Sequence, residues 1–285
     1  MKIHNELQML IDASVIDEAT AQRIRRFYQE RQEAKPNRLF IVFGVLGATL
    51  VGLGIILIIG HNWDQLPRAL KTAFAFIPLV VGQSLGIYAL LKRSDSMAWR
   101  ESTAAFITFA VGACIAMISQ IYHIQGELSG FLLTWSLLSL PLIYVLRSSV
   151  VSLLYLVAIT FYAYEVGYWV HPNTPPYLYL LLLAAMLPHY YNLHRNNPDS
   201  NFMSFHNWFV PLSVASVFGA FYDNYPILLY VGYIALFGFL LIVGEQPHFQ
   251  NRRSINNGYK VLGSLGSIIM LIVLSFEDVW KGIQR

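Results

Sequence analysis

Long apolar stretches alternate with short polar stretches along most of the chain. A polar and charged segment occupies residues 1–38, the first apolar stretch begins at Leu39, and the last ends near residue 276. Each stretch is close to the ~20 residues that an α-helix needs to cross a bilayer. The stretches are uniformly apolar, whereas membrane strands alternate between lipid-facing and lumen-facing residues, so the pattern predicts helices.

The apolar pattern predicts nine transmembrane helices and a small N-terminal element. The nine ranges are 39–60, 72–91, 102–121, 131–146, 150–170, 177–192, 207–222, 226–244 and 259–276. The pattern of apolar and polar positions in residues 1–38 predicts a short helical hairpin, with Asp17 as the N-cap of its second helix. The expected fold class is therefore all-α: a helical tail at 1–38 and a polytopic transmembrane helix bundle at 39–285.

Composition supports a membrane protein and excludes several other classes. The residues AVILMFWYC make up 56% of the chain, DEKR only 12%, and the mean hydropathy is +0.50. A soluble domain carries about 25% charged residues. The formal net charge of +3 is no nucleic-acid signature. A single cysteine, Cys114, excludes a disulfide within one chain and a cysteine-rich metal site.

The basic residues predict an orientation for the nine helices. With the N-terminus in the cytoplasm and the C-terminus outside, fifteen Lys and Arg residues fall on the cytoplasmic side. Four remain on the outer side: Arg68, Lys71, Lys281 and Arg285. Positive charge collects on the cytoplasmic side of membrane proteins, so this split favours an N-in, C-out, multi-pass protein.

Polar side chains near the outer ends of the first, third and fifth predicted helices are the candidate functional residues. Such groups are costly in a bilayer and often mark a site. The candidates are His61, Asn62, Asp64, Gln120, Tyr122, His123, Glu127 and Glu165. Two interpretations stay open. The residues cap helix ends and anchor at the interface, or they converge on an outward-facing site that binds a small molecule or a cation.

Three segments of the first half carry a resemblance to a known family. They are Leu10-Ile11 through Ile24, Asn62-Trp63-Asp64 through Lys71, and Gly112 through Gln120-Ile121-Tyr122-His123. In these segments the chain resembles the bacterial predicted-membrane-protein family called domain of unknown function 2157. The resemblance implies a bacterial inner-membrane protein. It implies no activity, no cofactor and no catalytic residue.

Three functions follow, in order of preference. The first is a transporter, or a small-molecule- or lipid-handling membrane protein that uses the outer polar residues. The second is a scaffold or assembly partner that binds another protein through the N-terminal helices. The third is a membrane-embedded metal enzyme with His61, Asp64, His123 and Glu127 as ligands, although no HExxH register is present.

Overall fold

The computed structural model describes residues 7, 9–11, 13, 15–24, 65–170, 175–221, 226–246 and 256–276. The chain divides into two compact units, Met1–Leu66 and Pro67–Arg285. The first predicted span, 39–60, lies outside the described residues. The predicted division into a tail at 1–38 and a bundle at 39–285 stays a prediction.

The first unit contains a helical turn around residues 9–11 and a helix that begins after Asp17. The Asp17 carbonyl accepts hydrogen bonds from the backbone N–H groups of Thr20 and Ala21, at 3.1 and 3.0 Å. A hydrogen bond with the Thr20 side chain lowers the pKa of the exposed Asp17 carboxyl below its ordinary value. Asp17 therefore occupies the N-cap position that the sequence predicts.

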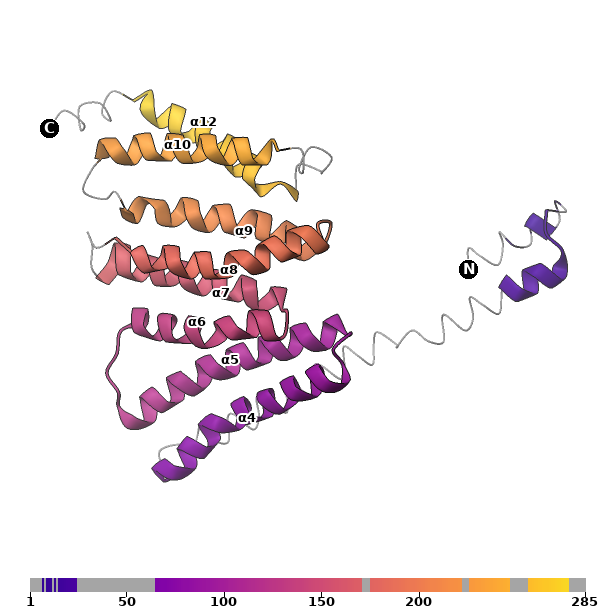
Figure 1. The fold of residues 1–285 in the computed structure, drawn as a ribbon, viewed down its shortest axis with the longest axis horizontal. Coiled ribbons are helices and arrows are strands. Elements are labelled where there is room, and N and C mark those ends of the chain that lie inside the picture. Colours follow the sequence, from indigo (N-terminus) through magenta and orange to yellow (C-terminus); the bar gives the residue numbers. More distant parts are fainter. Residues whose placement is uncertain are drawn as a thin grey trace. The chain divides into compact units, whose positions relative to one another are not determined.

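The second unit is a bundle of helices that follow one another in chain order (Figure 1). The helices are α4 (Arg68–Lys92), α5 (Met97–Tyr122), α6 (Leu128–Val145), α7 (Ser149–Tyr164), α8 (Tyr177–Asn196), α9 (Asn201–Phe218), α10 (Pro226–Gly244) and α12 (Gly258–Leu274). A π-helical turn, η2 (Glu165–Val170), continues α7, and a 3-10 turn, η3 (Gly219–Phe221), continues α9. No strand occurs in the described parts of the chain.

These helices match the second to ninth predicted ranges: α10 has the predicted bounds 226–244, and the others differ at one or both ends. The largest shift is in α9, which begins at Asn201 rather than at the predicted residue 207. The Ser200 hydroxyl accepts a hydrogen bond from the Met203 N–H at 3.1 Å and caps the helix there. A hydropathy window misses this start because the first turns of α9 contain several polar residues.

Four segments among the described residues are long and apolar enough to cross a membrane. They are Arg68–Lys92, Met97–Tyr122, Leu128–Val145 and Ser149–Trp169. Shorter apolar helices cover Leu228–Gly244 and Gly258–Leu274. By length and composition the chain is thus a helical membrane protein. The count of nine spans and the orientation stay predictions.

The core of the second unit lies around α7. Tyr155, Leu156 and Ile159 on α7 are almost completely buried, and α7 packs against α5, α6, α8 and α9. In contrast, α4 packs mainly against α5 and buries only small residues: Ala75, Gly82, Gly86 and Ala89. A Cβ atom at Gly82 or Gly86 would lie 3.1 Å from the Ile107 side chain, so both glycines permit a close helix approach.

Candidate functional site

The predicted outer residues fall into two groups. His61, Asn62 and Asp64 lie outside the described residues. Gln120, Tyr122, His123 and Glu127 are exposed at the α5–α6 connection, and Glu165 is half-buried at the first position of η2. The Tyr122 hydroxyl lies 3.1 Å from the Thr72 hydroxyl of α4. Convergence of all eight side chains on one site stays a prediction.

His123 and Glu127 have local roles at helix ends. His123 is the C-cap of α5 and has a left-handed backbone with φ of 51°. The N–H of Ile124 donates to the Ser119 carbonyl at 2.9 Å, which closes the helix as in a Schellman motif. Glu127 is the N-cap residue of α6. The Glu127 carboxylate accepts a hydrogen bond from the Ser129 hydroxyl at 3.3 Å and does not cap the helix, so the choice between the two interpretations stays open.

A buried carboxylate lies at the opposite end of the bundle. Glu101, in α5, is 8% exposed. Its Oε2 accepts hydrogen bonds from the Ser148 hydroxyl at 2.5 Å and the Val150 N–H at 3.0 Å, and its Oε1 accepts one from the Ser149 N–H at 2.9 Å. These N–H groups open α7, where the helix dipole favours negative charge. Glu101 therefore links α5 to the start of α7 by hydrogen bonds.

Two buried histidines continue this polar region. Ser149 Oγ lies 3.3 Å from His189 Nε2, and the rings of His189 and His206 are 6.2 Å apart. His206 is 0% exposed, and its Nδ1 lies 2.7 Å from the Phe202 carbonyl. Because a carbonyl only accepts, Nδ1 carries the proton. In the neutral ring Nε2 then accepts from the Ser152 hydroxyl, 2.9 Å away.

Tyr190 extends the hydrogen bonds to the last described helix. Its ring stacks on His206 with centroids 6.0 Å apart. The Tyr190 hydroxyl donates to Asn207 Oδ1 at 2.8 Å, so the Tyr259 hydroxyl, 3.1 Å away, donates to Tyr190. Side chains from α5, α7, α8, α9 and α12 thus meet in one polar cluster, which we call the Glu101–Tyr259 network.

A cleft of about 900 Å³ opens beside this network. Glu101, Ser149 and His189 belong to both. The remaining polar side chains of the cleft are Arg100, Tyr144, Arg147, Asn192, Asn196, Asn197 and Ser200. The Nε of Arg100 is buried and has no hydrogen-bond partner among the described residues. Glu101 is occupied by three donors, so the arginines dominate the charge offered to a ligand.

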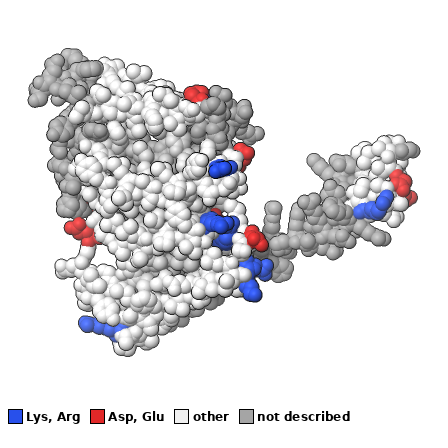
Figure 2. All heavy atoms as spheres, viewed as in Figure 1, with Lys and Arg blue, Asp and Glu red and all other residues white. Residues whose placement is uncertain are grey.

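The cleft lies at the more basic end of the second unit. On the face drawn in Figure 2, the charged side chains of this unit lie at the two ends of its helices, with an uncharged middle. Six described basic residues lie at the end with the cleft: Lys92, Arg93, Arg100, Arg147, Arg195 and Lys260. Two, Arg68 and Lys71, lie at the other end. We call the end with the cleft the basic end and the opposite end the far end.

The sequence interpretation missed the residues of this network. Glu101 precedes the predicted range 102–121 by one residue and therefore counts as a loop residue. His206 likewise precedes the range 207–222. His189 lies inside a predicted span, and an ionisable residue in an apolar stretch is a signal that could have identified it. Its hydrogen-bond partner, Ser149, lies on α7, 40 residues away in the chain.

No group of three or more His, Cys, Asp or Glu in the described part of the chain could hold a metal ion. Of the four predicted ligands, His61 and Asp64 lie outside that part. His123 and Glu127 are both exposed. The metal-enzyme hypothesis stays a prediction.

The helices and the cleft together define a multi-pass membrane protein with a polar cleft at one end of its bundle. A family model described as predicted membrane protein (DUF2157) matches residues 8–152. This match covers half of the chain, and the chain belongs to that family of predicted membrane proteins. No curated protein and no solved structure matches this chain. The matched range includes Glu101 and Ser149 but ends before His189.

Proposed function

We propose that the protein handles a small molecule at the membrane, as a transporter or binding protein, and that its ligand site is the cleft at the basic end. The observation that carries this proposal is the buried Glu101–Tyr259 network on the wall of the cleft. Buried polar and ionisable groups in a membrane protein are costly and commonly mark a ligand or ion pathway. A concave site with a few convergent polar groups is also typical of ligand pockets.

The ligand class follows from the charges in the cleft. Arg100 and Arg147 are permanently charged donors, and guanidinium groups bind carboxylates and phosphates in two-pronged geometry. Asn192, Asn196 and Asn197 both donate and accept hydrogen bonds. A small anion with further polar groups fits this set best. The cation that the sequence suggests for the outer side would need a different site.

The distribution of basic residues supports a cytoplasmic location for the cleft. Six basic residues lie at the basic end and two at the far end. The positive-inside rule then assigns the basic end to the cytoplasm, as in the predicted orientation. In a bacterium the membrane would be the inner membrane.

Transport, rather than binding alone, would need polar groups nearer the far end. Thr160 of α7 bonds Ser213 of α9 at 2.5 Å, and Ser213 bonds Tyr179 of α8 at 2.7 Å. Beyond them, Tyr168 donates to the Ser216 carbonyl at 3.1 Å. Glu165 lies where α7 becomes π-helical, a distortion frequent at functional sites. These groups support a path along α7 to the outer residues.

The test is anion binding by the purified full-length protein in detergent. The thermal unfolding midpoint is measured against increasing inorganic phosphate, sulfate and succinate. We expect at least one anion to raise the midpoint saturably, because ligands that bind the native state stabilise it. Replacing Arg147 with Gln should weaken its apparent affinity about tenfold, since it removes a charged hydrogen-bond donor.

Arg195→Gln is the matched control, because Arg195 is exposed in the last turn of α8 at the same end but outside the cleft. It should bind like the unmodified protein. An equal loss in Arg195→Gln and Arg147→Gln would show screening of general surface charge instead of a site.

An assembly role is the second candidate function. It is favoured by exposed apolar side chains in the first unit: the exposed fraction is 62% for Met9 and 66% for Val15. Deletion of residues 1–35 should then release a protein partner while the bundle still inserts in the membrane. Retention of every co-purifying partner by the truncated chain would contradict this role.

A further inference from the structure

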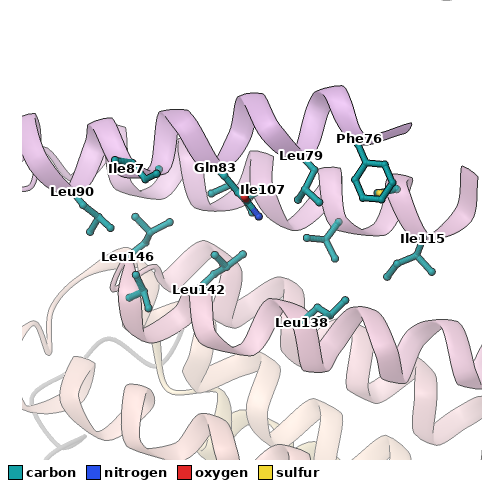
Figure 3. Close-up of a pocket in the computed structure, with 14 residues that line it drawn as sticks. Phe76, Leu79, Gln83, Ile87, Leu90, Ile107, Ile115, Leu138, Leu142 and Leu146 are labelled. Carbon is teal, nitrogen blue, oxygen red and sulfur yellow. The ribbon is translucent and has the colours of Figure 1, made fainter. Parts of the chain in front are cut away.

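An apolar groove lies between α4 and α6, is also lined by α5, and shares no lining residue with the cleft (Figure 3). Its volume is about 540 Å³. The lining residues are Phe76, Leu79, Gln83, Gly86, Ile87, Leu90, Ile107, Val111, Cys114, Ile115, Leu138, Leu142, Val145 and Leu146. Gln83 is the one amide among them. Phe76, Ile87 and Leu138 are largely exposed, so the groove is open along its side.

The groove results from the way in which three helices pack. Gly82 and Gly86 hold α4 close to α5. Trp135 of α6 lies against Gly112 of α5 and donates its indole N–H to the Thr108 carbonyl at 2.7 Å. The large indole ring keeps α6 apart from α5 just before Leu138. The space between α4 and α6 is therefore built into the packing.

The groove is somewhat longer than one leaflet of a bilayer is thick. Along α4 it extends from Phe76 to Leu90, which is about 21 Å at the rise of an α-helix. The hydrocarbon core of a bilayer is about 30 Å thick, so one leaflet contributes about 15 Å. An extended acyl chain of that leaflet can therefore lie along the groove for its whole length.

Positive charge lies where the groove reaches the basic end. Lys92 and Arg93 follow Leu90 at the end of α4, and Arg147 follows Leu146 after α6. These basic residues lie at the end of the groove, where lipid headgroups are expected. Basic residues at that depth attract anionic lipids. We propose that the groove binds an acyl chain of an anionic phospholipid whose phosphate lies near Lys92 and Arg93. The proposal goes beyond the small-molecule cleft and does not depend on it.

The acyl part of the proposal is tested by filling the groove. Native mass spectrometry of the full-length protein, with phosphatidylglycerol added at rising concentration, gives the occupancy of the bound lipid. Leu138→Trp places an indole in the groove and should reduce the apparent affinity at least about fivefold. Leu137→Trp is the control, because Leu137 is similarly exposed on α6 but does not line the groove. It should leave lipid binding unchanged.

The headgroup part is tested by removing charge. In the Lys92→Gln/Arg93→Gln variant, the preference for phosphatidylglycerol over phosphatidylcholine should fall roughly thirtyfold, at about one kcal/mol for each basic residue. Arg195→Gln, at the same end but away from the groove, should retain the preference. Retention of the preference in the double variant would overturn the assignment of the headgroup site.

Three other results would overturn the acyl proposal. Equal lipid binding by Leu138→Trp and Leu137→Trp would show that the groove holds no lipid. Loss of the bound species in Gln83→Leu would show that a polar ligand occupies the groove. A dimer mass that Leu138→Trp abolishes would show that a second copy of the chain covers it. Phosphate or succinate binding at the cleft is measured separately, so failure of either proposal is distinguishable.

Discussion

α7 and α4 are both long apolar helices, and they are held in the bundle by different means. α7 packs on four neighbouring helices and buries large side chains as well as Ser149 and Ser152. α4 packs mainly on α5 and buries only alanine and glycine. In a membrane, where lipid is as apolar as the helix surface, close packing and hydrogen bonds drive association. α7 is held by both, whereas α4 is held mainly by close packing of small residues, with the Thr72–Tyr122 hydroxyl pair joining it to α5 at the far end.

This difference separates the two proposed sites. Around α7, polar side chains are enclosed and find partners, so an aqueous cleft can border a buried network. Around α4, packing mainly on one neighbour, α5, leaves large apolar side chains exposed beside a groove. The polar cleft suits a soluble anion, and the groove suits a lipid chain.

The largest expected effect comes from truncating one isoleucine on each helix. Ile159 on α7 is 0% exposed and Ile77 on α4 is 50% exposed. Ile159→Ala should lower the free energy of unfolding by about 3 kcal/mol, because it leaves a cavity in the core. Ile77→Ala should change it by less than about 0.5 kcal/mol. Unfolding by sodium dodecyl sulfate measures both. Equal losses would show that α4 is packed as tightly as α7.

A smaller loss is expected at the start of α7. Glu101→Ala removes the acceptor of three hydrogen bonds and leaves the first N–H groups of α7 without a cap, which should cost about 2 kcal/mol. Glu101→Gln keeps an acceptor oxygen and should recover part of this loss. The same unfolding measurement applies. A fully stable Glu101→Ala variant would contradict the structural role of this carboxylate.

The smallest effect is a gain in stability. Arg147, between α6 and α7, has a left-handed backbone with φ of 49°, and His123 has φ of 51°. Such a conformation costs a non-glycine residue about 1 kcal/mol. Arg147→Gly and His123→Gly should each stabilise the fold by about that amount. Only Arg147→Gly should weaken anion binding, measured by thermal unfolding with added phosphate, sulfate or succinate. Unchanged binding in Arg147→Gly would remove Arg147 from the site.

Much of the fold could be predicted from the sequence, because an apolar run near membrane length predicts a helix without knowledge of its neighbours. Eight of the nine predicted ranges correspond to described helices, and 39–60 lies outside the described residues. Gly82 and Gly86 form a GxxxG pattern, which favours close helix packing without naming the partner, and the structure shows that the partner is α5. Boundaries were less accurate where polar first turns, as at Asn201, belong to the helix.

The candidate site was harder to predict because it depends on helix neighbours. Glu101, His189 and His206 come from α5, α8 and α9, and no spacing along the chain links them. The outer residues were easier to notice, since they end apolar runs. His123 and Glu127 lie at helix termini, as the C-cap of α5 and the N-cap residue of α6. Glu165 is half-buried, whereas Glu101 is buried and fully engaged in hydrogen bonds, although it lies at the edge of its apolar run.

The proposed function requires an electropositive cleft that opens at the cytoplasmic end of the bundle. Cys114 is the single cysteine, so a Cys114→Ser background permits one introduced thiol at a time. Asn196→Cys places a thiol in the cleft, and Gln120→Cys places one at the far end. Anionic and cationic membrane-impermeant thiosulfonates are applied to membrane vesicles of each orientation.

We expect Asn196→Cys to react only from the cytoplasmic side and Gln120→Cys only from the outer side. The rate of reaction with the anionic reagent, divided by the rate with the cationic reagent, should be about tenfold higher at Asn196→Cys than at Gln120→Cys. The arginines of the cleft attract the anionic reagent. Equal ratios at the two thiols would show that the cleft is not electropositive, and reaction of Asn196→Cys from the outer side would show that it does not open to the cytoplasm.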